Sequence, residues 1–339
     1  MKMCKKNIIS FCLFTVLVGF GCLLAYLRIY LNRTLADDKL IFVEKGMGLD
    51  RVVKKLKEEK IIYDKFTFKI IFKIRTKNKT NIRYGEYFFE KGITVGEVIK
   101  KIINNKVYYR TITFAEGLSN HTILKMIDNN EFLTGVIPDN IPEGSLLPET
   151  YTFQKGDTKK SLVERMQKSM IEAVDKYWES RAKDLPIRTK AEAIVLASIV
   201  EKETGIASER PLVASVFVNR LSLNMPLQSD PTAIYGYAFG DTSKEKEKKT
   251  NVLIRMDSPY NTYKIRALPP TPICNPGKQA INAVLNPAKT KYLFFVASGN
   301  GGHNFSENYR DHQKMVNSFR KVTKKRMDNN FETLPEPNK

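Results

Sequence analysis

The longest uncharged apolar segment of the chain follows a lysine-rich start. Residues 8–27 carry no charge. At about 1.5 Å per helical residue, such a run crosses a hydrocarbon core of about 30 Å. It exceeds the apolar part of a typical signal peptide, and no clear small-residue cleavage pattern follows it. The pattern predicts an uncleaved transmembrane helix at residues 7–27, after a short cytoplasmic start at 1–6.

A strand, a glycine turn and a short amphipathic helix recur in the next hundred residues. The segment FVEKG, ending at Gly46, is followed after a fixed step by VVKKL, and FEKG, ending at Gly92, is followed after the same step by VIKKI. A weaker third copy surrounds Gly117. Residues 107–114 alternate as a strand does, and residues 66–74 are apolar with interspersed lysines.

Two small α+β units of this kind resemble the LysM-like modules that accompany cell-wall enzymes. We assign them to residues 40–112, after a polar linker at 28–39. A connecting region at 113–155 holds the third copy. The alternative is a plain spacer that holds the later domain away from the membrane.

Residues 191–204 are predicted to form a buried helix. Positions 193–200 are consecutive apolar or small residues, too many for a usual strand and free of proline. Thr189 and Glu192 fit a capping box at its start, and Gly205 suits its end. This helix is the centre of the predicted larger domain.

The predicted helix ends in Glu201 and Glu203, which continue different stripes. Glu201 follows the stripe of Ala197, whereas Glu203 follows that of Leu196. Only one of them can easily face a given site. A carboxylate at the end of an apolar helix is partly desolvated, which favours its protonated form and provides a general acid near neutral pH. The alternative is that both are solvated charges paired with a nearby lysine or arginine.

The other segments predict further helices, a hairpin and two long polar loops. Loops of this length without structure of their own are often functional. Residues 139–153 form a turn-rich junction, and residues 326–339 form a flexible tail. The predicted elements are helices at 159–178, 211–223 and 311–324, strands at 292–297 and 303–306, and loops at 225–232 and 258–277.

Charge and rare residues narrow the chemistry. The net charge of +20 favours polyanionic surroundings, namely nucleic acid, anionic lipid or acidic wall polymers. Cys274 is the one cysteine outside the predicted anchor and its flank, so neither an intramolecular disulfide nor a cysteine metal cluster is expected. The three histidines lack metal-ligand spacing, and no serine-nucleophile or phosphate-loop motif occurs in a suitable context. No metal and no cofactor is predicted.

Two polar loops suit a sugar ligand, whose apolar faces stack and whose hydroxyls need fixed partners. One holds the sequence QSDPT at 228–232, and the other holds SPYNTY at 258–263. A glycoside hydrolase needs a second carboxylate about 5–9.5 Å from the first. The candidates, which the sequence does not place, are Asp230, Glu203, Glu209 and Asp257.

Four long motifs carry a family resemblance. They are ASIVEKETGIASERPLVASVFVNRL, LQSDPTAIYG, SPYNTYKIRALPPTPICNPG and NPAKTKYLFFVASGNGGHNFSENYRDH, in this order behind the apolar helix and EGSLLPETYTF. The chain resembles the endolytic murein transglycosylase (YceG-like) family. Ala267 and Thr271 stand where the family pattern has glycine, which puts the loop shape in doubt.

The resemblance implies a lytic transglycosylase that cuts the bond from N-acetylmuramic acid (MurNAc) to N-acetylglucosamine (GlcNAc) in nascent strands and leaves 1,6-anhydro ends. It implies Glu201 as the catalytic acid and later base, with Glu203 as the second choice. One glutamate suffices because an internal hydroxyl replaces water. The residues that it implies in the glycan cleft are Gln228, Ser229, Asp230, Asn261, Thr262, Tyr263 and His303.

The resemblance also implies a single-pass protein of the bacterial inner (cytoplasmic) membrane, with its N-terminus in the cytoplasm and an extracytoplasmic catalytic domain at 156–325. Its expected partners are peptidoglycan strands, the membrane and peptidoglycan synthases (penicillin-binding proteins), without nucleic acid. The expected fold is α+β, with LysM-like units before a larger domain whose central helix lies above a sheet. The alternatives are a non-catalytic wall-binding scaffold and a tethered nucleic-acid binder.

Overall fold

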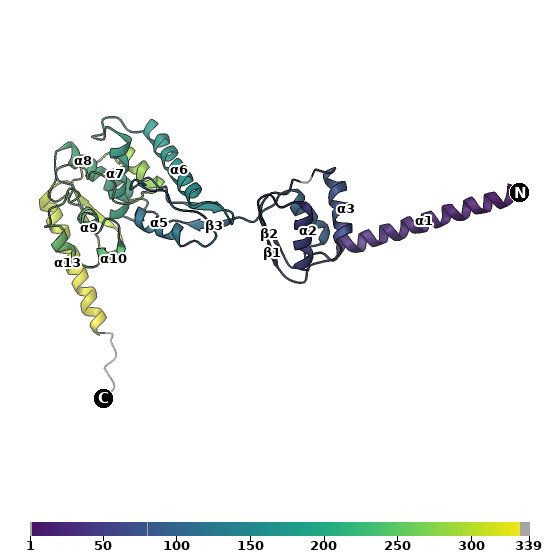
Figure 1. Cartoon of the computed structure of the whole chain (residues 1–339). Coiled ribbons are helices and arrows are strands. Elements are labelled where there is room, and N and C mark those ends of the chain that lie inside the picture. Colours follow the sequence, from purple (N-terminus) through teal and green to yellow (C-terminus); the bar gives the residue numbers. More distant parts are fainter. Residues whose placement is uncertain (1, 80, 333–339) are drawn as a thin grey trace. The chain divides into compact units, whose positions relative to one another are not determined.

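The structure is a computed structural model that describes residues 2–79 and 81–332, with the side chains of 2–8 and 324–332 left aside. The chain forms two compact units (Figure 1). Unit 1 comprises Met1–Arg110 and Thr152–Gly156, and unit 2 comprises Thr111–Tyr151 and Asp157–Lys339. Helices and strands occur in both units, so the mixed fold class is confirmed.

Unit 1 holds a long helix and a small α+β body around a two-stranded antiparallel sheet. In this sheet Lys39 lies opposite Phe89 and Val43 lies opposite Gly85. The helices pack their buried apolar residues against the sheet. The elements are α1 (Lys2–Asn32), β1 (Lys39–Val43), α2 (Leu49–Glu58), α3 (Lys65–Thr76), β2 (Gly85–Phe89) and α4 (Val95–Ile103).

The repeated pattern of strand, glycine turn and helix is present in all three copies. Gly46, Gly92 and Gly117 have φ angles of +79°, +82° and +79°, a left-handed conformation that glycine adopts without steric cost. The third copy consists of β3 (Arg110–Thr113) and α5 (Asn120–Asp128). Its strand pairs with β4 (Thr150–Phe153), so it belongs to a different sheet from the strands of the first two copies.

Helix α3 occupies the segment of apolar residues and lysines between the first two copies. The Asp64 carboxylate accepts hydrogen bonds from the backbone N–H groups of Phe66 and Thr67, which satisfies two donors of the first turn. Phe68 and Phe72 are buried at the spacing of one helical turn. Of the lysines of this helix, Lys73 is exposed, whereas Lys65 and Lys69 are partly buried.

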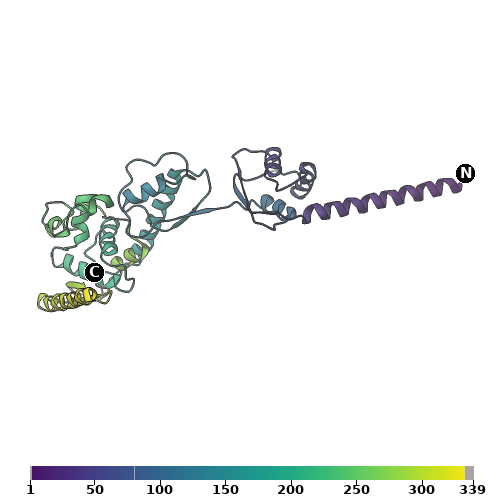
Figure 2. The ribbon, with the colours of Figure 1, turned by 90° about the horizontal axis from the view of Figure 1, so that it is seen from below.

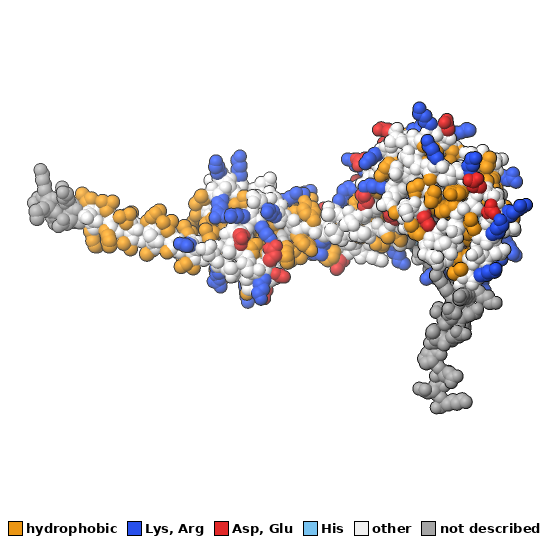
Figure 3. Space-filling view, turned by 180° about the vertical axis from the view of Figure 1, so that it is seen from behind, with side chains coloured by type: hydrophobic (Ala, Val, Ile, Leu, Met, Phe, Trp, Pro, Cys, Tyr) orange, Lys and Arg blue, Asp and Glu red, His pale blue; other side chains and the backbone are white. Residues whose placement is uncertain are grey.

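Helix α1 contains a candidate membrane span at Ile9–Asn32, with a mean hydropathy of 2.2 over its most apolar window and none of that window buried. It is one continuous helix in both ribbon views (Figure 2), and hydrophobic side chains cover it (Figure 3). The predicted linker at 28–39 is part of unit 1: its first residues belong to α1, and the following ones bond to the backbone at the start of α4. Leu35 N–H donates to Ile93 O and Val95 N–H donates to Arg33 O, both at 3.0 Å.

Unit 2 is mostly helical. Besides β3 and β4, it contains an antiparallel hairpin of strands β5 and β6, in which Phe294 lies opposite Ser306. Its remaining elements are α6 (Lys159–Glu179), α7 (Lys190–Glu203), α8 (Arg210–Ser222), α9 (Asp230–Ala238), α10 (Thr242–Glu245), α11 (Thr250–Leu253), α12 (Lys278–Leu285), β5 (Phe294–Ala297), β6 (His303–Ser306) and α13 (Tyr309–Glu332).

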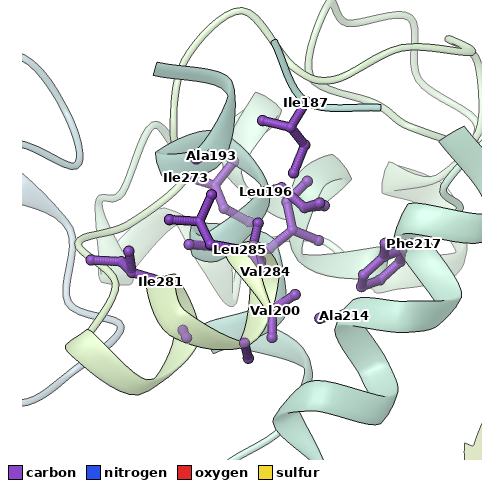
Figure 4. Close-up of a cluster of buried hydrophobic side chains, with 14 of the residues drawn as sticks. Ile187, Ala193, Leu196, Val200, Ala214, Phe217, Ile273, Ile281, Val284 and Leu285 are labelled. Carbon is purple, nitrogen blue, oxygen red and sulfur yellow. The ribbon is translucent and has the colours of Figure 1, made fainter. Parts of the chain in front are cut away.

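The central helix of unit 2 is surrounded by helices, which corrects the expected sheet beneath it. Within the described residues, α7 packs against α12, α8, α6 and α9. Figure 4 shows Leu196 and Val200 of α7 among side chains from α8 and α12. The sequence patterns did not reveal α12, which takes the place of the sheet. The last helix, α13, also extends beyond its predicted end at residue 324.

Candidate active site

Helix α7 is built to project its C-terminal acids from a rigid core. Its first turn has the predicted capping box: Glu192 N–H donates to Thr189 Oγ1 at 3.1 Å, and Thr189 N–H donates to the Glu192 carboxylate at 3.2 Å. The helix ends at Glu203 because Thr204 adopts an extended backbone. Gly205 lies beyond this end and is not left-handed.

Glu201 lies in a network of buried and partly buried charges. Its Oε1 accepts a hydrogen bond from Arg210 Nη2 at 2.8 Å, and its Oε2 accepts one from the backbone N–H of Gly277, also at 2.8 Å. The side chains of Glu201 and Arg210 are only 4% and 8% exposed. Arg210 also donates to Glu116 and Gln279.

This network gives each carboxyl oxygen of Glu201 a hydrogen-bond donor. Both of its oxygens are occupied by donors, and one donor is a cation. A Cβ atom on Gly277 would clash with Glu116, so the backbone approaches this closely only because glycine stands there. Burial and the charge of Glu201 raise the pKa of Glu116, while Arg210 lowers it.

Glu203 points into a cleft of about 320 Å³ on another side of the same helix end. Ser229 Oγ donates a hydrogen bond to its Oε1 at 2.5 Å. Burial raises the pKa of Glu203 to about 7, and the Asp230 charge adds to this rise. The Ser229 hydrogen bond, His303 and Arg220 oppose the rise, but less strongly. A pKa raised to about 7 makes a protonated Glu203 carboxyl available as a general acid near neutral pH.

The structure brings three of the predicted cleft residues together around Glu203. Gln228, Asp230 and Tyr263 line the same cleft. The phenol of Tyr263 donates to Asp230 Oδ1 at 2.6 Å, which fixes both side chains. The polar loops at 225–232 and 258–277 are thus joined at the cleft, as their composition suggested.

Three further predicted residues support the cleft from inside. Ser229, Asn261 and Thr262 are at most 1% exposed. The Asn261 amide donates to backbone carbonyls of residues 253, 254 and 256, and Thr262 Oγ1 accepts from Ser229 N–H at 2.9 Å. Asn261 and Thr262 therefore hold the loops in place and are not among the residues that line this cleft, so their contact with a glycan stays a prediction.

His303 is bound to Glu209 rather than exposed in the cleft. Its Nδ1 lies 2.6 Å from Glu209 Oε2, and its backbone N–H donates to Glu209 Oε1 at 2.9 Å. Burial raises the pKa of Glu209, but the His303 hydrogen bonds outweigh it and hold that pKa below its usual range. His303 is also one of the groups that lower the pKa of Glu203.

Several cleft residues were not identified from the sequence. They come from α8, the hairpin and α13, and the most informative are Arg220, Phe294, Tyr309 and His312. The His312 ring stacks on Phe294, with ring centroids 5.1 Å apart, and its buried Nδ1 has no hydrogen-bond partner among the described residues. Burial and the Arg220 charge lower the pKa of His312. Phe294, Tyr309 and His312 add aromatic surface to the cleft beside that of Tyr263.

The likeness to known proteins covers most of the chain. The YceG-like family matches residues 41–318. The endolytic murein transglycosylase of Bacillus subtilis is 36% identical over 179 residues, which are 52% of this chain and 48% of that relative. The protein of the same name from Streptococcus pneumoniae serotype 2 is 31% identical over 223 residues, which are 60% of this chain and 40% of that relative. The chain thus spans less than half the length of these curated relatives.

A solved structure supports the same assignment. The crystal structure of a YceG-like protein from Listeria monocytogenes has a TM-score of 0.50 and 28% identity, covering 82% of this chain and 98% of that one. The family match extends from β1 in unit 1 to α13 in unit 2. The chain therefore belongs to the YceG-like family.

Proposed function

We propose that this chain is a membrane-anchored lytic transglycosylase that cuts the MurNAc–GlcNAc bond inside nascent peptidoglycan strands and leaves 1,6-anhydroMurNAc ends. The observation that carries the proposal is the burial of Glu203, which raises its pKa, in a cleft lined by amide, carboxyl and aromatic side chains. The names of the two bacterial relatives support the same substrate class.

Glu203 is the acid in this proposal, in place of Glu201. A general acid must hold a proton and reach the substrate. Glu203 meets both demands, whereas Glu201 is paired with Arg210 and Gly277 and lies away from the cleft lining. Four of the seven predicted sugar-binding residues also gather at Glu203, namely Gln228, Ser229, Asp230 and Tyr263.

The reaction needs one carboxyl group acting twice. The Glu203 proton passes to the glycosidic oxygen as the bond from this oxygen to the MurNAc C1 breaks. The resulting carboxylate accepts the proton of the MurNAc 6-hydroxyl, whose oxygen forms the new bond to C1. Ser229 stabilises the carboxylate between the two steps, because its hydrogen bond favours the ionised form. No water enters the products.

The anchor and unit 1 complete the proposal. Helix α1 would tether the catalytic unit to the outer face of the cytoplasmic membrane, where new strands emerge beside peptidoglycan synthases. The LysM-like unit 1 would contact the wall, and the net charge of +20 attracts its anionic polymers. Cleavage at this place would end the growth of a glycan strand.

Product chemistry tests the function. The full chain in detergent micelles is incubated with purified peptidoglycan, and the new ends are identified by mass spectrometry, with Glu203→Gln as the matched control. We expect anhydro ends from the wild type and none from the variant. Reducing ends would indicate a hydrolase instead. Retention on peptidoglycan by a folded wild type without any cleavage would indicate a scaffold.

A further inference from the structure

Helix α3 has a second apolar face that unit 1 does not cover. Its core-facing side chains join the hydrophobic core of unit 1. Three large apolar side chains on its other side, each four residues from the next, lie in one stripe about 12 Å long. This exposed stripe consists of Phe66, Ile70 and Ile74, which are 71%, 42% and 71% exposed.

Basic residues accompany the exposed stripe. Segment 65–77 contains five lysines and arginines and no acidic residue. Lys69 pairs with Asp50 of helix α2, and Arg75 reaches the carbonyl of Gly96 at 3.5 Å. A helix with large apolar residues on one side and lysines beside them has the composition of a helix that lies in a membrane interface.

Helix α3 lies beside the part of α1 that forms the candidate membrane span. Tyr26 Oη and Thr67 Oγ1 lie 3.3 Å apart, and Tyr30 Oη donates to Asp64 O at 2.9 Å. Both tyrosines belong to the candidate membrane span. Figure 1 shows α3 at the end of unit 1 where α1 leaves it. The first turn of α3, which begins the exposed stripe, therefore lies beside the last turns of the apolar helix.

We propose that α3 docks on the outer surface of the lipid bilayer that α1 spans. Phe66, Ile70 and Ile74 enter the boundary between headgroups and acyl chains, and the neighbouring lysines meet anionic headgroups. Unit 1 is then attached at two points, α1 and α3, which sets its orientation on the membrane. This inference rests on the proposed anchor and is independent of catalysis.

Tryptophan quenching by lipid tests the docking. Trp178 is the one tryptophan of the chain and lies in unit 2, so Trp178→Phe provides a background for single probes. The full chain carrying one probe is reconstituted in phosphatidylglycerol vesicles, with lipids brominated near the headgroup for Phe66→Trp and its control, and with lipids brominated deep in the acyl chains for a probe within α1. Tyr109→Trp replaces another exposed aromatic residue of unit 1 as the matched control, and Leu17→Trp reports insertion of α1.

We expect quenching of the probes at 66 and 17 and little quenching of the probe at 109. Equal, weak quenching at 66 and 109 with strong quenching at 17 would overturn the docking while leaving the anchor intact. Absence of quenching at 17 would overturn the anchor and the docking with it. Wall digestion by the same samples reports the catalytic proposal separately.

A double variant tests which side chains hold helix α3 at the membrane. With the probe at 66, Ile70→Ser combined with Ile74→Ser should reduce quenching toward the level of Tyr109→Trp. Both sites are exposed, so far-ultraviolet circular dichroism should stay unchanged. Replacing phosphatidylglycerol by phosphatidylcholine should weaken the quenching at 66. Equal quenching in both lipids would contradict the role given to the lysines.

Discussion

The two sides of the C-terminal end of α7 show how neighbouring acids acquire different roles. Glu201 is buried, and both of its oxygens accept hydrogen bonds, one of them from a guanidinium. Glu203 has Ser229 as a neutral donor and Asp230 as a nearby negative charge. The first surroundings stabilise a charge, and the second favour a bound proton.

This difference shows that burial alone does not make a catalytic acid. Both glutamates are largely removed from solvent by the same helix and the same core. The partners that come from other segments decide how each carboxyl group is paired. For Glu201 these partners are Arg210 and Gly277, and for Glu203 they come from the loop before α9.

The largest expected effect is on catalysis at the cleft side. Glu203→Gln keeps the hydrogen bond from Ser229 but cannot donate the proton. Because general acid catalysis contributes about 10²–10⁴-fold, the rate of anhydro-end formation should fall by this factor. The rate is measured on purified peptidoglycan, and Trp178 fluorescence should confirm the wild-type fold. A variant with more than a tenth of the wild-type rate would exclude Glu203 as the acid.

The next effect is on stability at the ion-pair side. Glu201→Gln leaves the buried Arg210 without one of its carboxylates, and breaking a buried pair from one side costs about 3–5 kcal/mol. We expect the unfolding free energy to fall by about 3 kcal/mol, at the lower end of this range, because Glu116 and Gln279 still bind Arg210. Urea unfolding followed by Trp178 fluorescence measures the loss.

A matched exposed pair controls for the charge change. Glu164→Gln on α6 disrupts a pair with Lys160 in which the glutamate is 58% exposed, so unfolding should change by less than about 0.5 kcal/mol. Among folded molecules, Glu201→Gln should retain most of the catalytic rate. Unchanged stability combined with lost activity would reverse the roles of the two glutamates.

The pH dependence of stability gives a smaller effect with a defined sign. The pKa of Glu203 is raised from 4.5 to about 7 in the folded chain. Below pH 4.5 the carboxyl is protonated in both folded and unfolded chains. Between these two pKa values the unfolded chain releases the proton while the folded chain still holds it. The unfolding free energy therefore falls by about 1–3 kcal/mol as the pH rises to the folded pKa, and it changes no further above that.

Glu203→Gln removes this dependence. The unfolding free energy of the variant relative to wild type should therefore increase by about 1–3 kcal/mol between pH 5 and pH 8. Urea unfolding at both pH values measures the change. Other titrating groups cancel in the comparison, and a difference that is independent of pH would contradict the raised pKa.

The smallest effects separate the two neighbours of Glu203. Ser229→Ala removes a hydrogen bond that lowers the pKa of Glu203, so this pKa should rise. Asp230→Asn removes a negative charge that raises it, so this pKa should fall. The alkaline limb of the pH–rate profile should move up in the first variant and down in the second, with rate losses of about threefold to tenfold. If the alkaline limb moved in the same direction in both variants, this account would be contradicted.

Local patterns predicted the parts of the fold that depend on near neighbours. The capping box of α7 follows from Thr189 and Glu192, and both of its hydrogen bonds are present. The three glycine turns follow from the repeat around Gly46, Gly92 and Gly117. In each case the residues that satisfy the backbone lie within one or two turns of each other.

The choice between the two glutamates needed contacts between distant segments. Gly277 lies 76 positions from Glu201, and Ser229 lies 26 positions from Glu203. Helical spacing shows that the acids face different ways but not what each one meets. Aromatic residues such as Phe294 and Tyr309 also look like core residues until the hairpin and α13 place them at the cleft.

Asn261 and Thr262 were predicted to contact the sugar, and in the structure their side chains form hydrogen bonds within the protein. Asn261 satisfies backbone carbonyls around α11, because a long buried loop lacks the internal hydrogen bonds of a helix or sheet. Thr262 serves the turn before α9 in the same way. Residue type predicted that both matter near the site, and only their burial distinguishes support from contact.

The central claim is that the proton held at the end of α7 belongs to Glu203. Carbon-13 NMR of the chain with labelled glutamate carboxyl groups observes this proton directly, with Glu203→Gln and Glu201→Gln prepared in parallel. We predict a carboxyl resonance that titrates near pH 7, disappears in Glu203→Gln and persists in Glu201→Gln. A resonance near pH 7 that disappears only in Glu201→Gln, or no such resonance in the wild type, would contradict the account.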